Sequence, residues 1–206
     1  IITAFEQGEI DILVGTQMLT KGLDFRNVTL VGILNADSML NIPDFRAHER
    51  SFQLIQQVSG RAGRTQKRGT VLIQSYNPHH QILQQVSMNA YEKMYHEQLE
   101  ERHVYKYPPF CRTIKITLKH RDFQKIEESS VWLGQALKNV FKDQVLGPEP
   151  PPVSRIRNEY YRNILIKIPR KQSLEKTKKA ILKIRSTFLS ISQYRSVKIV
   201  LDVDNY

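Results

Sequence analysis

Three short runs of mainly apolar residues place the tightest limit on how this chain can fold. They cover residues 11–15, 28–34 and 70–75, and they lack the regular apolar–polar alternation of a half-exposed strand. Such runs are typical of parallel strands that are covered on both faces. A stretch with helical character, residues 45–60, lies between the last two. Strands that alternate with helices predict an open parallel α/β sheet, of which three strands make only a part.

A second feature divides the chain in two. Residues 81–104 contain neither glycine nor proline and favour a helix, whereas Tyr107-Pro-Pro-Phe110 stops any helix because each proline lacks an amide donor. We therefore expect three parts. These are part of a sheet domain over residues 1–80, a connecting helix over 81–104 and a second domain over 105–206.

The second domain is predicted to contain two β-α-β halves. Asp122 can cap a helix that runs to about residue 142, and Ser173 can cap another. A proline-rich stretch, residues 147–152, reads as a stiff linker that could hide a further strand. The repeated pattern predicts a ferredoxin-like α+β fold. Its expected strands are residues 113–119, 163–168 and 197–203.

Charge is concentrated in this second domain. Residues 1–104 contain 10 Lys and Arg against 11 Asp and Glu, whereas residues 105–206 contain 21 against 9, a net charge of +12. Clustered Lys and Arg are typical of surfaces that bind nucleic-acid phosphates, although they also serve as solubilising surface. The single cysteine, Cys111, excludes an internal disulfide and a cysteine zinc cluster within this chain, which fits a reducing, cytoplasmic setting. No apolar run approaches the roughly 18 residues of a membrane span.

Two arginines with glycines around them form the most informative motif. In Gln57-Val-Ser-Gly-Arg-Ala-Gly-Arg64 the arginines are three residues apart and can converge on one phosphate group. Taken alone, the motif could equally be a basic loop without a ligand. A second segment, residues 15–25, directly follows the first predicted strand, where parallel sheets bind their ligands.

The two segments together resemble motifs V and VI of superfamily-two helicases. The G-x-D core of motif V corresponds to Gly22 and Asp24, and the pattern Q-x-x-G-R-x-x-R of motif VI corresponds to residues 57–64. The resemblance implies that Arg61 and Arg64 stabilise the γ-phosphate of ATP during hydrolysis. It also implies two further sets of site residues. Gly22, Asp24, Gln57 and Gly60 would serve the nucleotide site, and Thr16, Gln17 and Lys21 would contact the DNA strand.

The resemblance narrows to the primosomal protein N′ (PriA) family of replication-restart helicases. The segments that carry it are residues 16–31, 36–37, 43–50, 107–110, 146–148 and 200–204. It implies a C-terminal fragment of an ATP-dependent 3′-to-5′ helicase that recognises stalled or branched forks and initiates primosome assembly in the bacterial cytoplasm, at the nucleoid. The implied cofactors are ATP with Mg²⁺, and zinc in a module upstream of this segment. The implied partners are forked and single-stranded DNA, the tail of single-stranded DNA-binding protein, primosome proteins and the helicase loader.

The phosphate-binding P-loop and the acidic metal-binding motif of such enzymes are not found in this sequence. We therefore expect the chain alone to bind DNA without hydrolysing ATP. Two other classes stay open. One is a different superfamily-two translocase, such as a RecG-like fork enzyme, and the other is a non-catalytic DNA- or protein-binding module.

The basic domain contains two sets of candidate contact residues. The first combines positive charge with an aromatic ring, as proteins that bind phosphates and stack bases do. Its members are Arg155, Arg157, Tyr160, Tyr161 and Arg162. The alternative for this stretch is a solvated loop whose tyrosines pack into the core. The second set, Arg170 and Lys171, precedes the last predicted helix and is our candidate contact for the tail of single-stranded DNA-binding protein.

Overall fold

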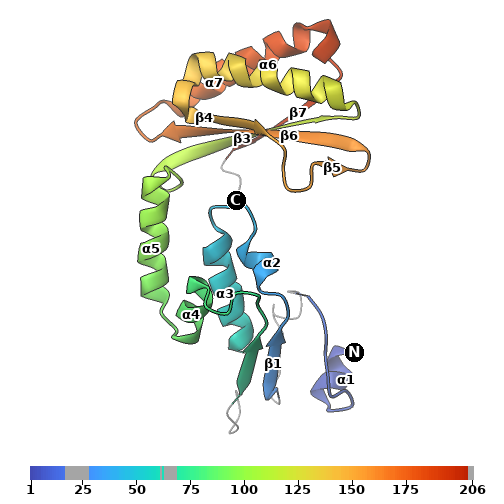
Figure 1. Ribbon diagram of the computed structural model, residues 1–206, viewed down its shortest axis with the longest axis vertical. Helices are drawn as coiled ribbons and strands as arrows, with labels where there is room; N and C mark the ends of the chain where they lie inside the picture. The colour runs from blue at the N-terminus through green and yellow to red at the C-terminus, as the bar shows by residue number, and fades with distance from the viewer. Residues whose placement is uncertain (17–27, 61, 63–68, 204–206) are drawn as a thin grey trace. The chain divides into compact units, whose positions relative to one another are not determined.

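The computed structural model describes residues 1–16, 28–60, 62 and 69–203 (Figure 1). Two compact units divide the chain. They are an N-terminal unit, Ile1–Glu100, and a C-terminal unit, Glu101–Tyr206, and each is described by itself. No helix in the described ranges is long and apolar enough to cross a bilayer.

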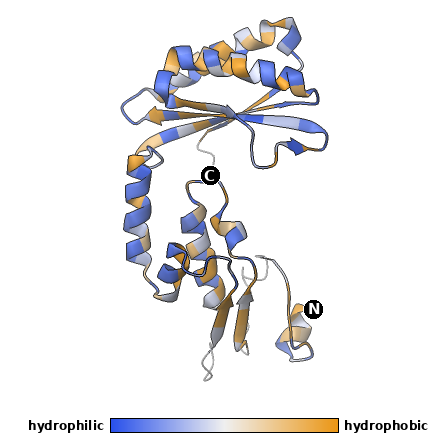
Figure 2. Ribbon diagram, in the orientation of Figure 1, coloured by the Kyte–Doolittle hydropathy of each residue, from blue (hydrophilic) through white to orange (hydrophobic). Residues whose placement is uncertain are grey.

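A pair of parallel strands forms the sheet of the N-terminal unit. Strand β1 (Leu30–Ile33) pairs with β2 (Thr70–Ile73), and Figure 2 shows both as largely hydrophobic. The predicted parallel pairing is confirmed, but full burial on both faces is not. Leu30 and Leu72 remain exposed, whereas Ile33 and Ile73 pack against buried side chains of the helices. Among the described residues, only one face of this strand pair is covered.

The strand predicted over residues 11–15 does not form. These residues are irregular, and the side chains of Ile12 and Val14 are 78% and 81% exposed. A strand needs a neighbour for its backbone N–H and C=O groups, and β1 and β2 pair only with each other in the described part of the chain. The short helix α1 (Ile2–Glu6) precedes this segment and ends before Gly8, whose φ of +79° suits glycine.

Four more helices follow in the described part of the N-terminal unit, and the last of them continues past the end of this unit at Glu100. They are α2 (Asp37–Leu40), α3 (Ala47–Ser59), α4 (Gln81–Ser87) and α5 (Tyr91–Val104). The single connecting helix expected over residues 81–104 is therefore two helices, separated at Met88–Ala90, where Asn89 has a positive φ of 52°. Tertiary packing accounts for the break, because Ile82, Val86 and Met94 all lie in one buried cluster with Phe52 and Ile55 of α3. The segment thus supplies core residues as well as a connection.

Among the described residues, the C-terminal unit is a five-stranded antiparallel sheet with two long helices on one face (Figure 1). Four strands lie in the spatial order β4-β6-β3-β7, and the short strand β5 (Arg155–Ile156) pairs with β6 beside them. The four are β3 (Cys111–His120), β4 (Val145–Glu149), β6 (Glu159–Pro169) and β7 (Lys198–Val203). The helices are α6 (Phe123–Phe141) and α7 (Leu174–Ser190). The two β-α-β units interleave in this order, so the ferredoxin-like prediction is confirmed. The proline-rich stretch expected as a linker contains the end of β4.

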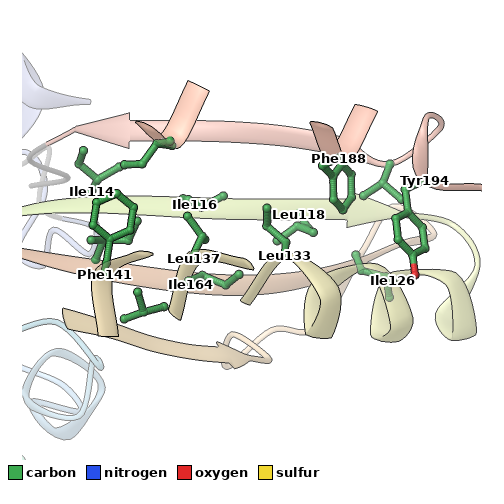
Figure 3. Close-up of a cluster of buried hydrophobic side chains, with 14 of the residues drawn as sticks. Ile114, Ile116, Leu118, Ile126, Leu133, Leu137, Phe141, Ile164, Phe188 and Tyr194 are labelled. Atoms are coloured by element: carbon green, nitrogen blue, oxygen red, sulfur yellow. The ribbon is translucent and has the colours of Figure 1, made fainter. Parts of the chain in front are cut away.

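Alternate residues of β3 and β6 form the core of this unit beneath α6 and α7 (Figure 3). Ile114, Ile116 and Leu118 pair in register with Ile166, Ile164 and Arg162, and all six are buried. The two helices begin at the predicted caps. The Asp122 carboxylate accepts a hydrogen bond from the Lys125 amide at 2.7 Å, and the Ser173 hydroxyl accepts one from the Lys176 amide at 3.4 Å.

Candidate nucleic-acid interface

The residues that resemble helicase motifs fall mostly outside the described ranges. Gln17, Lys21, Gly22 and Asp24 lie there, as do Arg61 and Arg64, so the nucleotide contacts expected of them stay predictions. Three of the site residues predicted from the two motifs are described. Thr16 is exposed in an irregular segment, Gln57 is exposed on the last turn of α3, and Gly60 ends that helix.

The carboxyl end of the parallel strand pair is stabilised by Asp37, which the sequence reasoning did not single out as a site residue. The Ser75 hydroxyl donates to one carboxylate oxygen of Asp37 at 2.9 Å, and the Tyr76 amide donates to the other at 2.9 Å. The Tyr76 amide is the main cause of a lowered pKa for this carboxyl group, and Ser75 lowers it further. Asp37 therefore ties the segment after β1 to the segment after β2, at the edge where such sheets bind ligands.

A short hairpin in the C-terminal unit presents two of the predicted DNA-contact residues. Strand β5 (Arg155–Ile156) pairs with the start of β6 through Arg157 and Asn158, whose φ angles are 48° and 64°. Two positive φ values fit a tight two-residue turn. Arg155 donates a hydrogen bond to the Asn158 side chain, and its guanidinium carbon lies 5.0 Å from the ring centroid of Tyr160.

Arginine is an unusual residue for the tip of this turn. A non-glycine residue in the left-handed region costs on the order of 1 kcal/mol, and asparagine and glycine tolerate the region best. Arg157 occupies it at an exposed position. The hairpin therefore holds a cation at its tip despite a local conformational cost.

Arg162 lies inside the unit, and Tyr160 is half-buried against its core. The ring of Tyr160 contacts that of Phe123 edge-on, with centroids 5.3 Å apart. Arg162 is only 8% exposed, and its guanidinium forms an ion pair with Glu127 of α6, donates to the Tyr161 carbonyl at 2.8 Å and lies over the Phe123 ring. Burial lowers the pKa of Arg162. We therefore leave Arg162 out of the proposed DNA surface.

Arg170 and Lys171 are exposed in the turn that joins β6 to α7. The structure brings no other predicted site residue into contact with them in the described ranges. Their contact with an acidic tail stays a prediction.

A basic cluster that the sequence analysis did not assign lies beside the hairpin. The Lys198 ammonium donates to the Glu159 carboxylate at 2.8 Å, and this bond is the main cause of a lowered pKa for Glu159. Lys119 and Arg121 lower it further through their positive charge. The Lys119 Nζ also lies 5.2 Å from the ring centroid of Tyr161. Tyr161 is half-buried, and from Arg162 onward the even-numbered residues of β6 are buried whereas the odd-numbered ones are not.

Two family models match the chain. The helicase conserved C-terminal domain matches residues 1–66, and the primosomal protein N C-terminal domain matches residues 103–206. The first match places the unit with the parallel strand pair in the family of helicase C-terminal domains, and the second places the antiparallel α+β domain in the primosomal family. The chain belongs to the PriA family of primosomal proteins and corresponds to their C-terminal part.

Individual relatives support this membership. The chain is 42% identical over 184 residues to the replication restart protein PriA of Bacillus subtilis. The matched segment covers 88% of this chain and 23% of the relative. The chain is 40% identical over 173 residues to PriA of a Synechocystis species, covering 82% and 21% respectively. The protein of Haemophilus influenzae is 37% identical over 201 residues, covering 97% and 27%. The chain thus spans about a quarter of the length of these relatives.

Proposed function

We propose that this chain is the C-terminal part of an ATP-dependent 3′-to-5′ DNA helicase that recognises stalled or branched forks and initiates primosome assembly. The observation that carries the proposal is the order of the two family matches, a helicase domain over residues 1–66 followed by the primosomal domain over residues 103–206. A different superfamily-two translocase would account for the first match but not for the second. We place the activity of the proposed helicase in the bacterial cytoplasm, at replication forks on the nucleoid.

The nucleotide would bind at the carboxyl end of the parallel strands. Gln57, exposed on the last turn of α3, has an amide that can donate to a phosphate oxygen, and Gly60 ends the helix just before Arg61. In the proposal Arg61 and Arg64 neutralise charge on the γ-phosphate, while Gly22 and Asp24 relay its presence to Thr16, Gln17 and Lys21 on the DNA strand. Bound ATP with Mg²⁺ would supply the free energy for movement along DNA.

The C-terminal unit would bind DNA through its positive charge. The net charge of +12 over residues 105–206 and the arginine at the strained tip of the β5–β6 hairpin support this assignment. Arg155 and Arg157 would contact phosphates from the hairpin. Arg170 and Lys171, at the separate turn before α7, would contact the acidic tail of single-stranded DNA-binding protein, with primosome proteins and the helicase loader as further partners.

The test is a titration of fluorescent forked and single-stranded DNA with the 206-residue chain at 50 mM and 200 mM salt. We expect binding that is micromolar or tighter at the lower salt and at least tenfold weaker at the higher, because each phosphate contact releases counterions. We also expect no ATP turnover by this chain. Absence of binding at the lower salt would overturn the DNA assignment and leave the C-terminal unit as a protein-docking module.

Partner binding needs its own measurement. Replacing Arg170 and Lys171 with alanine should weaken binding of a synthetic acidic tail peptide severalfold. Lys93→Ala, which removes a cation from the exposed part of α5, is the matched control. Equal peptide affinity for the variant and the parent chain would remove this part of the proposal.

A further inference from the structure

One face of the C-terminal sheet is not covered by its helices. Helices α6 and α7 both lie on the other face (Figure 1). Since side chains alternate along a strand, the odd-numbered residues of β3 and β6 point to the uncovered face. The register sets them side by side. Lys115, Thr117 and Lys119 of β3 pair with Leu165, Asn163 and Tyr161 of β6, and with Asp202, Val200 and Lys198 of β7.

The chain itself closes one end of this face. The Lys167 ammonium donates to the Tyr105 carbonyl at 2.7 Å and lies 3.6 Å from the ring centroid of Tyr107. Burial there lowers the pKa of Lys167, and its partner in register, Thr113, is 1% exposed. A ligand therefore cannot reach this end without displacing the segment before β3.

The opposite end is open and basic. The Lys198 side chain is 69% exposed, and Val200 on the same strand is 46% exposed. Lys119, Arg121 and Lys198 gather around a single carboxylate, that of Glu159. Three positive charges against one negative charge leave a local excess of positive charge, which complements a phosphate backbone and disfavours a basic partner.

An aromatic ring lies within this basic end. Tyr161 is directly paired with Lys119 across the strands, and the Lys119 ammonium lies over its ring. That ammonium ends a flexible side chain, so it can move to a phosphate when a base takes its place on the ring. Beside Tyr161, the Thr117 hydroxyl donates to the Asn163 side-chain oxygen at 3.0 Å, which orients the amide. The amide nitrogen can then donate to the edge of a base.

We propose that this open end of the sheet is a platform for unpaired DNA, with a base stacked on Tyr161 and phosphates bound by Lys119 and Lys198. The proposal rests on the DNA-binding function proposed above and adds the form of the substrate. A base stacked inside a duplex has no free face to offer an aromatic ring, whereas an unpaired base does. The uncovered strand surface with an aromatic ring at its open end thus favours single-stranded DNA, or the unpaired arm of a fork, over duplex.

The experiment compares the chain with Tyr161→Ala and Tyr161→Phe on three ligands. These are a fluorescent dT tract, the same tract with abasic sites in place of its bases, and a duplex of equal charge. Loss of the ring should weaken dT binding by about tenfold, because base–aromatic stacking is worth roughly that much per base. Tyr161→Phe should retain affinity within about twofold. Duplex affinity should be little changed in both variants.

The abasic tract isolates stacking from charge. The parent chain should lose about tenfold in affinity when the bases are removed, and Tyr161→Ala should lose nothing further. Lys198→Gln should weaken dT and abasic binding equally. Lys179→Gln, an exposed cation of α7 paired with Glu175, is its matched control and should change neither. Tyr76→Ala, on an exposed tyrosine of the N-terminal unit, controls for loss of a ring elsewhere.

The outcomes separate the two proposals. If the parent chain binds no DNA at low salt, the proposed function fails. If it binds dT but neither Tyr161→Ala nor removal of the bases changes affinity, only the platform is overturned. A thermal melt of each variant identifies any loss of folding. Should Tyr161→Ala unfold, the parent chain and Tyr161→Phe are still compared on the dT tract and the abasic tract. Equal affinity for the two tracts would then overturn the platform.

Discussion

Gly134 and Pro148 are in direct contact between helix α6 and strand β4. The ring of Pro148 occupies the space where a side chain at position 134 would begin, because an ideal Cβ there would lie 2.8 Å from the proline Cδ. The proline ring is fixed to its backbone and cannot swing aside. The close approach of the helix to the edge strand therefore depends on glycine at this position.

Gly134→Ala should destabilise the C-terminal unit by about 1–2 kcal/mol. Overpacking costs on the order of 1–3 kcal/mol, and the higher helix propensity of alanine offsets part of this. Chemical denaturation followed by the fluorescence of Trp132, the single tryptophan, measures the change. Gly32→Ala is the control, since nothing lies within 4 Å of its added methyl. A Gly134→Ala variant as stable as the parent would contradict the contact.

Glu127→Gln should destabilise the same unit by about 1–2 kcal/mol. The substitution leaves the guanidinium of Arg162, only 8% exposed, without its carboxylate partner. The full cost of breaking a buried pair is reduced because the Glu127 side chain is 40% exposed. Arg162→Met combined with Glu127→Gln should cost less than the sum of the single changes. Strict additivity in this double-mutant cycle would show that the two side chains do not interact.

Arg162 and Arg157 should differ in their effect on DNA. Arg157→Gln should weaken DNA binding severalfold and reduce the salt slope by about 0.7–0.9, as expected for one lost phosphate contact. Arg162→Met, measured where it is fully folded, should change DNA affinity by less than about twofold. Titrations at four salt concentrations provide both slopes. If Arg162→Met lowered the slope as Arg157→Gln does, the sequence-based assignment of Arg162 to the DNA surface would be correct.

Stability of helix α4 should fall as the pH drops below about 6.5. His80 caps this helix, because its Nδ1 accepts from the Ile82 amide at 3.2 Å. Burial lowers the pKa of His80 below its ordinary value of 6.5, the nearby His48 lowers it further, and Asp37 opposes them. The unfolded chain therefore takes up the proton first. The loss of stability begins near the unfolded pKa and ends once the pH passes below the folded one.

Hydrogen exchange of the α4 amides at pH 7.5 and 5.5 measures this effect. His80→Asn keeps a capping oxygen without a titrating ring, so protection in α4 should depend less on pH. His80→Ala should lower protection at pH 7.5 by about 1 kcal/mol, because it removes the cap. An unchanged pH dependence in His80→Asn would assign the effect to other groups.

Local chemistry explains which elements were predictable from sequence. Asp122 and Ser173 cap their helices through bonds to amides three residues on, so the pattern that predicts each cap also contains its partner. The strands β3, β6 and β7 follow from the alternation of apolar and polar residues or from apolar runs. Both are patterns of residues that are close in sequence, as the caps are. The ferredoxin-like fold was predictable because few connections fit two β-α-β units.

Other features depend on residues that are distant in sequence. The break between α4 and α5 follows from packing against α3, and β4 forms in a proline-rich stretch because β6 offers it a partner. Residues 11–15 have the apolar run of a strand but no described neighbour to pair with.

The concentration of charge in the second half of the chain, the helix caps and the family all follow from the sequence alone, because each resides in composition, local spacing or a linear motif. The tertiary structure sets the face of the sheet on which each of three neighbouring side chains lies. Tyr160 and Arg162 lie on the side of α6 and Tyr161 lies on the opposite face, because α6 packs on one face of the sheet only. The basic cluster of Lys119, Arg121 and Lys198 likewise exists only once β3 and β7 pair.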